Sequence, residues 1–206
     1  DPDDKAFENP SKPVGPYFTS YRANLLMQEH GWQMVEEAGR GWRKVVPSPM
    51  PTRILGSGLL RRLISDGAVV IAGGGGGIPV YQDVGGYYRG VEAVIDKDYV
   101  ASILACELEA DLFIILTNVP MVAEGFGRPN QRWLRTLPAD RAHEMLVGNQ
   151  FPPGSMGPKV RAALQFVETT GKEVLITDAE HLKRALAREA GTFIVAEGEI
   201  ETAPLA

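Results

Sequence analysis

Short apolar runs alternate with longer helical stretches along most of this chain, and that alternation constrains the fold more than any other feature. Residues 112–116 form a short, uninterrupted run, as in strands that a parallel sheet buries on both faces. Similar runs span residues 68–72, 173–177 and 192–195, and helical patterns lie near residues 98–108, 138–147, 158–169 and 180–189. This order predicts an α/β fold with a doubly wound, mainly parallel sheet and helices on both faces.

Composition argues against several classes of function. The 206 residues carry a formal net charge of -5 with Lys and Arg dispersed, so we expect no basic surface for a nucleic acid. Cys106 is the single cysteine, which rules out an intrachain disulfide or a Cys/His metal cluster and favours a reducing, cytoplasmic setting. No apolar run approaches the roughly 20 residues that span a bilayer, so we expect no membrane partner.

The first part of the chain predicts a small α+β subdomain that protrudes from the rest. Prolines make residues 1–18 loop-like, and Thr19 is a suitable N-cap for a helix that follows. Two short strands, residues 33–36 and 42–46, then flank a turn.

A stiff proline-rich exit separates this subdomain from the rest of the chain. We therefore predict two domains, residues 1–46 and residues 47–206. The second begins with a helix from Thr52 that has one apolar face, followed by the strand of residues 68–72. It contains the remaining alternating elements.

Five consecutive glycines, residues 73–77, directly follow that predicted strand. Gly74, Gly75, Gly76 and Gly77 lack side chains, so a small anion could approach converging peptide N–H groups. Neither the Walker loop nor the dinucleotide fingerprint fits, because strand-forming residues follow instead of a helix. A tight turn without a ligand explains the run equally well.

A lysine stands between two aspartates in Asp96-Lys97-Asp98, at the predicted start of a helix. Its ammonium group is suited to meet phosphoryl charge while a neighbouring carboxylate holds it in position. The alternative is a solvated charge cluster at a helix N-terminus, where aspartates are favoured. Taken alone, the pattern favours that alternative.

Two further segments are candidates for binding a nucleotide. They comprise Ser155, Met156, Gly157 and Lys159 in the first, and Thr117, Asn118 and Val119 in the second. The first opens a predicted helix, where free N–H groups, the helix dipole and a lysine suit a phosphate. The second follows a buried strand, at an edge where ligands collect in open α/β sheets. A plain helix start and an ordinary loop remain the alternatives.

Taken together, these segments resemble the carbamate kinases of the amino acid kinase family. The matching segments occur in the family's order and are residues 9–17, 39–49, 73–80, 90–98 and 154–160. Any one match is weak, whereas the ordered set is specific and reaches from residue 1 to about residue 195. The resemblance implies an amino acid kinase-like fold in which residues 1–46 are lid-like. The chain would be the C-terminal two-thirds of such a protein.

The resemblance implies reversible phosphoryl transfer between ATP and carbamate, giving ADP and carbamoyl phosphate with Mg²⁺. Lys97 and Lys159 would neutralise the transferring group, and Asp98 would orient both ammonium groups. Lys12 would reach over the site from the lid-like subdomain, and no side chain is assigned to a metal. Related kinases usually carry a small residue in place of Lys97, so this lysine favours carbamate as the acceptor.

The resemblance also shows where this chain differs. Relatives begin well upstream, with a glycine loop that touches the phosphates, so we expect a partner chain that supplies this portion. A homodimer is the other expectation. Asn118 and Pro120 stand where many relatives carry acidic residues. A non-catalytic binding or assembly subunit, and a kinase for another small acceptor, are the alternative functions.

Overall fold

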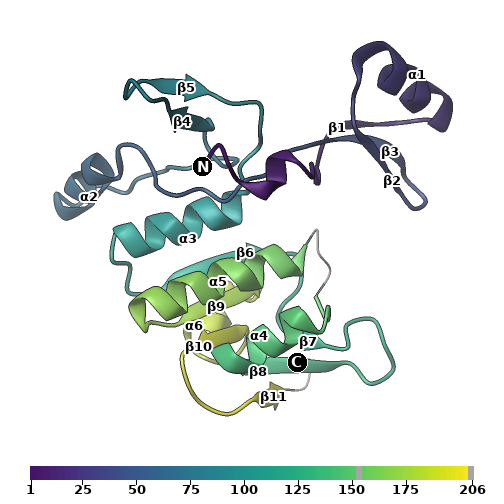
Figure 1. Ribbon diagram of the computed structural model, residues 1–206. Helices are drawn as coiled ribbons and strands as arrows, with labels where there is room; N and C mark the ends of the chain where they lie inside the picture. Colours follow the sequence, from purple (N-terminus) through teal and green to yellow (C-terminus); the bar gives the residue numbers. More distant parts are fainter. Residues whose placement is uncertain (152–154, 204–206) are drawn as a thin grey trace. The chain divides into compact units, whose positions relative to one another are not determined.

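The computed structural model describes residues 1–151 and 155–203. They divide into two compact units, each built from separate stretches of the chain (Figure 1). Unit 1 contains Asp1–Arg53 and Gly73–Lys97, and unit 2 contains Ile54–Ala72 and Asp98–Ala206. The predicted lid-like subdomain falls within unit 1 and stays a prediction as a functional domain.

A three-stranded antiparallel sheet forms the first part of unit 1. Its order is β1 (Lys12–Phe18), β3 (Gly41–Val46) and β2 (Met34–Glu37). Helix α1 (Ser20–His30) packs on it through a small core that includes Ala23. The predicted cap is present, because the Thr19 hydroxyl accepts a hydrogen bond from the backbone N–H of Arg22 at 3.3 Å.

The prediction that residues 1–18 form only a loop is wrong. A short 3₁₀ helix spans Lys5–Phe7, and β1 is a strand despite its prolines. It lies at the edge of the sheet, and its register with β3 shifts between Val14 and Phe18. Edge strands and bulges are the places where a sheet tolerates proline, which offers no N–H to the ladder.

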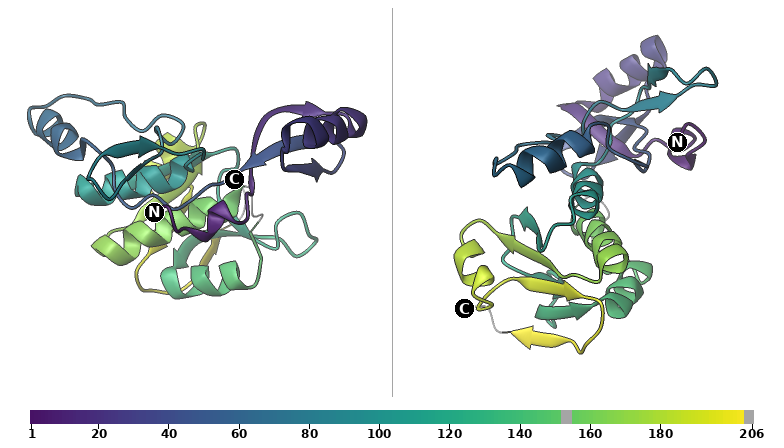
Figure 2. Two further views of the ribbon diagram at one scale, coloured as in Figure 1. Left: turned by 45° about the horizontal axis from the view of Figure 1, so that its top comes forward. Right: turned by 90° about the vertical axis from the view of Figure 1, so that its left-hand side faces the viewer.

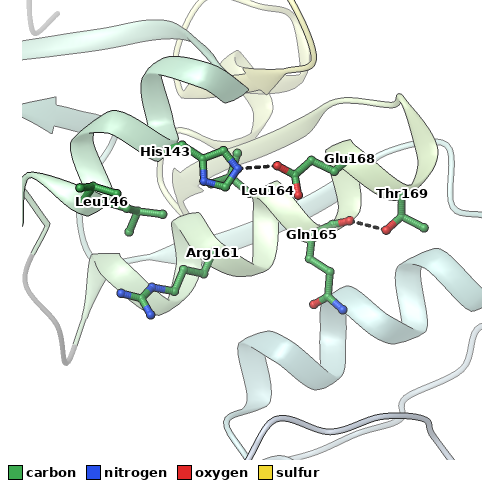
Figure 3. A pocket seen from close by; sticks show the side chains of 8 residues that line it. His143, Leu146, Arg161, Leu164, Gln165, Glu168 and Thr169 are labelled. Atoms are coloured by element: carbon green, nitrogen blue, oxygen red, sulfur yellow. Dashed lines mark hydrogen bonds and ion pairs between the residues drawn. The ribbon is translucent and has the colours of Figure 1, made fainter.

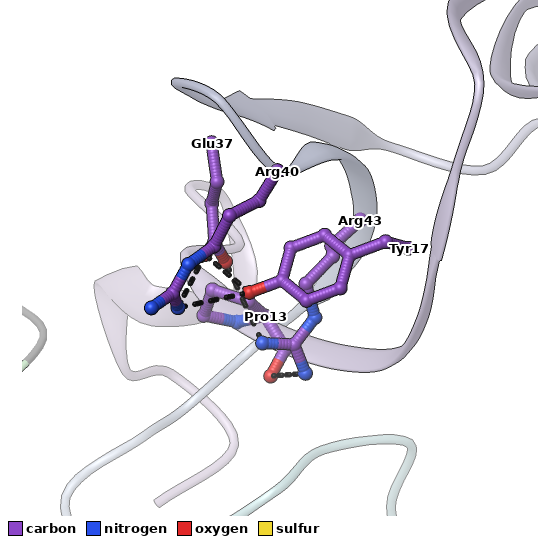
Figure 4. A network of polar contacts seen from close by, with 5 residues as sticks. All are labelled: Pro13, Tyr17, Glu37, Arg40 and Arg43. Atoms are coloured by element: carbon purple, nitrogen blue, oxygen red, sulfur yellow. Dashed lines mark hydrogen bonds and ion pairs between the residues drawn. The ribbon is translucent and has the colours of Figure 1, made fainter.

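Polar side chains join β1 to the β2–β3 hairpin (Figure 4). The Tyr17 hydroxyl donates to a Glu37 carboxylate oxygen at 2.7 Å, and Arg40 donates to the same hydroxyl at 3.3 Å. Arg43 donates to the carbonyl of Pro13 at 3.3 Å. These contacts hold the edge strand where its ladder is interrupted.

The rest of unit 1 contains the glycine run and a hairpin of β4 (Val80–Gln82) and β5 (Tyr88–Gly90). A strand after the glycines was predicted and is confirmed. The backbone N–H of Val94 then donates to the carbonyl of Pro47 at 2.9 Å. That bond connects the segment before Asp96 to the end of β3.

Unit 2 contains a six-stranded sheet and, from Lys97 onward, four helices. Its strands are β6 (Phe113–Thr117), β7 (Val122–Glu124), β8 (Arg132–Pro138), β9 (Val174–Asp178), β10 (Thr192–Val195) and β11 (Glu201–Ala203). The helices are α3 (Lys97–Glu107), α4 (Ala139–Val147), α5 (Met156–Thr170) and α6 (Leu182–Leu186). The α/β class predicted from the sequence is confirmed.

The sheet is mixed rather than mainly parallel. β6 pairs with β9 and β8 with β10 in parallel, whereas β9–β10, β7–β8 and β8–β11 are antiparallel. The connection from β7 to β8 is a hairpin, too short for the crossover that a parallel pair requires.

Helices cover both faces of this sheet, as the right-hand view of Figure 2 shows. α4 and α5 lie on one face, where a core that includes Phe166, Val160 and Ile176 is buried. α6 lies on the other face against Leu175 and Phe193. Alternate residues of β6, β9 and β10 therefore enter different cores, which explains their apolar sequences.

Residues 68–72 do not form the buried strand that the sequence predicts. Val69 and Ile71 are 98% and 99% exposed, and no strand of the described residues pairs with this segment. A strand needs a neighbour to satisfy its backbone N–H and C=O groups. The preceding helix, α2 (Ser57–Ser65), has no buried residue either. No helix among the described residues is long and apolar enough to span a membrane.

Candidate functional site

The glycine run in unit 1 adopts a backbone that only glycine tolerates well. Gly73, Gly74, Gly76 and Gly77 all have positive φ angles, and the N–H of Gly76 donates to the carbonyl of Gly73 at 2.9 Å. Gly76 has a φ of 127° and is buried; a Cβ there would lie 2.1 Å from the Ile95 carbonyl oxygen. The run is therefore a turn fixed against the segment that leads to Asp96.

Lys12 and Asp96 form an ion pair in the same unit. The Lys12 ammonium nitrogen lies 2.5 Å from a carboxylate oxygen of Asp96, whose side chain is nearly buried. The structure thus places Lys12 beside Asp96 within unit 1, and its role as a lid residue stays a prediction. Asp96 itself was not predicted as a site residue.

Burial alternates along the sequence around Lys97. Lys97 is exposed, and its neighbours Asp96 and Asp98 are both buried. Helix α3 begins at Lys97, as predicted. An exposed cluster of charges is therefore not what the structure shows, because two of the three charged side chains are removed from solvent.

Asp98 and Lys159 form a buried ion pair in unit 2. The Lys159 ammonium nitrogen donates to a carboxylate oxygen of Asp98 at 2.9 Å, and both residues are 9% exposed. Two helices supply the pair, since Asp98 lies in the first turn of α3 and Lys159 in the first turn of α5. The predicted orientation of Lys159 by Asp98 is thus geometrically possible.

The start of α5 is the second feature that could contact a phosphate. Ser155 is its N-cap residue but makes no side-chain hydrogen bond to the helix. The first N–H groups of a helix have no partner within it, so an anion is a suitable one. Gly157 is buried in this first turn. Gly154, which belongs to the sequence motif, lies outside the described residues.

A small cavity collects four of the predicted nucleotide-binding residues. It measures about 120 Å³ and is lined by Asn118, Val119, Met121, Ala123, Phe126, Gln150, Phe151, Ser155 and Met156. Asn118 and Val119 come from the loop after β6, and Ser155 and Met156 open α5. Thr117, Gly157 and Lys159 are not among the lining residues. The two predicted segments therefore meet at one mostly apolar cavity.

Sequence reasoning missed the other residues of this cavity. Met121, Ala123 and Phe126 belong to the β7–β8 hairpin, and β7 has only three residues, too few for a periodic pattern. Phe126 packs edge-on against Trp133 with ring centroids 6.2 Å apart. An aromatic residue between glycines, shortly after a buried strand, was the available signal.

A hydrogen bond from the neighbouring strand positions the loop that carries Asn118. The hydroxyl of Thr177, on β9, donates to the carbonyl of Pro120 at 3.2 Å. Asp178 pairs with Thr117 in register at the ends of these parallel strands. Burial alone would raise the pKa of Asp178, but hydrogen bonds from His181 outweigh it and lower that pKa.

A larger cavity in unit 2 contains none of the predicted site residues (Figure 3). It measures about 470 Å³ and lies between α4 and α5. His143 contacts a Glu168 carboxylate oxygen there at 2.5 Å. The larger of these two cavities is therefore not the one that the predicted nucleotide-binding residues line.

The family model for "Amino acid kinase family" matches residues 15–178. The chain belongs to the amino acid kinase family.

Its relatives include several carbamate kinases. That of Thermococcus kodakarensis is 45% identical over 197 residues, covering 96% of this chain and 62% of the relative. That of Staphylococcus haemolyticus is 47% identical over 193 residues, covering 93% of this chain and 62% of the relative. The structure of carbamate kinase from Giardia lamblia bound to AMP-PNP has a TM-score of 0.83 and 41% identity, covering 95% of this chain and 62% of that one. The chain thus spans 62% of the length of these relatives.

Proposed function

We propose that this chain forms the larger part of a carbamate kinase, which transfers a phosphoryl group reversibly between ATP and carbamate. The observation that carries the proposal is the buried Asp98–Lys159 pair at the start of α5, with exposed Lys97 next to Asp98 in the sequence. Phosphoryl transfer requires mainly positioning and positive charge around the phosphoryl oxygens. Lysines held by buried carboxylates supply fixed positive charge.

The residues of unit 2 support a nucleotide role. The apolar cavity beside Asn118 and Met156 would hold the base of ATP or ADP. Lys159 lies one helical turn beyond Met156, so the phosphates would extend toward its ammonium group and the free N–H groups of α5. The AMP-PNP complex of the Giardia lamblia relative supports a nucleotide as the ligand.

In the direction that forms ATP, an oxygen of the terminal phosphate of ADP would attack the phosphorus of carbamoyl phosphate. The bond from phosphorus to the carbamoyl oxygen breaks, and carbamate leaves with the electron pair. No proton is transferred, so the reaction needs no side-chain base. Lys97 would stabilise the negative charge that shifts between the two oxygens.

The residues of unit 1 would contribute backbone donors and a lysine. Gly74, Gly75, Gly76 and Gly77 would receive phosphate oxygens, because their turn is free of side chains. Lys12 would act as the lid residue that adds a point charge. These assignments follow the resemblance together with the contacts within unit 1.

Mg²⁺ fits this chemistry as a companion of the nucleotide. No group of three or more His, Cys, Asp or Glu side chains suited to a metal occurs within residues 1–151 and 155–203. Mg²⁺ usually keeps several waters and binds substrate phosphates with one or two carboxylates. When bound, it neutralises phosphate charge. The single cysteine and the metabolite substrates fit a cytoplasmic location.

We propose further that the portion of a carbamate kinase that this chain does not match covers an apolar strip of unit 2. The strip comprises Leu55, Leu59, Leu63, Ile64, Val69 and Ile71, all exposed. Exposed apolar surface of this extent marks an interaction site, and residues 68–72 have the composition of a strand without a neighbour. The chain matches 62% of its relatives' length, so the unmatched portion of a carbamate kinase is the segment that would cover this surface.

The test of function is activity after complementation. The chain is produced together with the unmatched portion of the Staphylococcus haemolyticus carbamate kinase as a separate polypeptide, and ATP formation from ADP and carbamoyl phosphate is measured. We expect ATP formation that Lys159→Ala abolishes. An assembled pair that binds ADP without forming ATP would contradict the proposal and favour a non-catalytic subunit.

The test of the partner surface uses the same two polypeptides. Val69→Asp with Ile71→Asp should abolish their co-purification, because two buried, unpaired carboxylates would replace apolar contacts. Val84→Asp is the matched control, since Val84 is fully exposed but lies outside the strip. Native mass spectrometry identifies the species. Assembly unchanged by the double substitution would remove this surface, and a homodimer lost with it would identify a second copy as the occupant.

A further inference from the structure

Asp96 is a buried carboxylate to which the resemblance assigns no role. It is 6% exposed, and a buried charge is costly unless it is paired. A lysine from a strand 84 positions earlier pairs with it, with 2.5 Å between the Lys12 nitrogen and the Asp96 oxygen. Lys12 is therefore an ion-pair partner of the buried Asp96 carboxylate.

Backbone bonds fix both partners of this pair. Lys12 lies opposite Val46 in the β1–β3 ladder, and the N–H of Ser11 donates to the Val46 carbonyl at 3.2 Å. The next carbonyl, that of Pro47, accepts from the N–H of Val94 at 2.9 Å. Val46 and Pro47, at the end of β3, therefore hold the segment that carries Lys12 and the segment that leads to Asp96.

The glycine run is fixed against the same segment. Gly76 packs on the carbonyl of Ile95, the residue before Asp96, so closely that any side chain at Gly76 would collide with it. Lys12, Asp96 and the glycine turn therefore lie close to one another within unit 1. This arrangement defines where the lysine's ammonium group can lie.

We infer that Asp96 is the positioning residue for Lys12, holding its ammonium group for an oxygen of the phosphoryl-bearing substrate. The inference rests on the proposed function. An ammonium group has three N–H donors, so Lys12 can keep its contact with Asp96 and still donate to a phosphate oxygen. Asp96 would affect the reaction through Lys12, so the effect of its removal on kcat/KM should depend on whether Lys12 is present.

A double-mutant cycle in the complemented enzyme tests this dependence. Asp96→Asn keeps the shape and removes the charge, and it should lower kcat/KM for carbamoyl phosphate by about tenfold, as expected for a coupled pair. In a Lys12→Met background the same change should have little further effect. Losses that multiply would contradict the inference, because a purely structural role does not depend on Lys12. Asp83→Asn is the matched control, removing the carboxylate that pairs with Arg89 in the same unit.

A second measurement needs no activity and uses the 206-residue chain alone. An amine-acetylating reagent should modify Lys12 several-fold faster in Asp96→Asn than in the unchanged chain, as read by peptide mass spectrometry. Lys44, which lies over the Trp32 ring at 4.6 Å, should keep its rate and thereby report that unit 1 is folded. Asp96→Glu should keep Lys12 protected. Equal Lys12 rates in all three forms would overturn the inference even if ATP formation succeeds.

Discussion

Replacing Lys97 with alanine is expected to lower kcat of the complemented enzyme by on the order of 100-fold, the effect of removing one preorganised electrostatic contact. KM for ADP and carbamoyl phosphate should change much less. The physical reason is the placement of Lys97, an exposed ammonium group between two buried carboxylates at the start of α3. A charge positioned where negative charge redistributes during transfer acts more on turnover than on binding.

Steady-state kinetics of ATP formation measures this effect. Lys97→Arg should not restore the rate, because a planar guanidinium group cannot replace a compact ammonium group at one point. Lys183→Ala, which removes an exposed lysine of α6, is the matched control. Near-normal kcat in Lys97→Ala would show that Lys97 takes no part in phosphoryl transfer. The argument for carbamate as acceptor would fall with it.

Removing the positive charge of Lys159 is expected to destabilise unit 2 by on the order of 3 kcal/mol, the usual cost of breaking a buried ion pair from one side. Lys159→Met keeps the length of the side chain but leaves the buried Asp98 carboxylate without its partner on α5. Adding Asp98→Asn should recover part of the loss, since the carboxylate that paired with Lys159 is then neutral.

Urea unfolding of the 206-residue chain gives the measurement. Trp133 is the tryptophan of unit 2, so its fluorescence reports that unit once Trp32 and Trp42 are replaced by phenylalanine. Lys183→Met serves as the control at an exposed position. A free energy of unfolding unaffected by Lys159→Met would mean that Asp98 is compensated by other contacts, and the double variant would then bring no recovery.

Elements with a strong local pattern were predictable from the sequence. The strand near residues 112–116 and the helix near 158–169 lie in the core of unit 2, where their own apolar residues determine their packing. Local sequence determines such elements, so local reasoning finds them. The Asp98–Lys159 pair was predicted only through the family resemblance, because its two residues lie 61 positions apart in the sequence.

Features that depend on distant partners were not predictable in the same way. Residues 68–72 have the composition of a buried strand, yet a strand exists only with a neighbour, and none of the described residues supplies one. β1 shows the opposite case, because its prolines conceal a strand that the ladder with β3 establishes. Phe126 reaches the cavity only through the β7–β8 hairpin. The Lys12–Asp96 contact likewise joins residues that are far apart in the sequence, so no local pattern predicts it.

The interleaving of the two units has a consequence for inheritance. The chain passes from one unit to the other after Arg53, after Ala72 and after Lys97, so neither unit is encoded by a continuous stretch of gene. A single recombination event between two related genes, at whatever point between these crossings it falls, would assemble at least one unit from both parents. Its buried contacts, such as Lys12 with Asp96, would then join residues that had not been selected together. We therefore expect the two units to be inherited together, with few successful recombination events between residues 53 and 98.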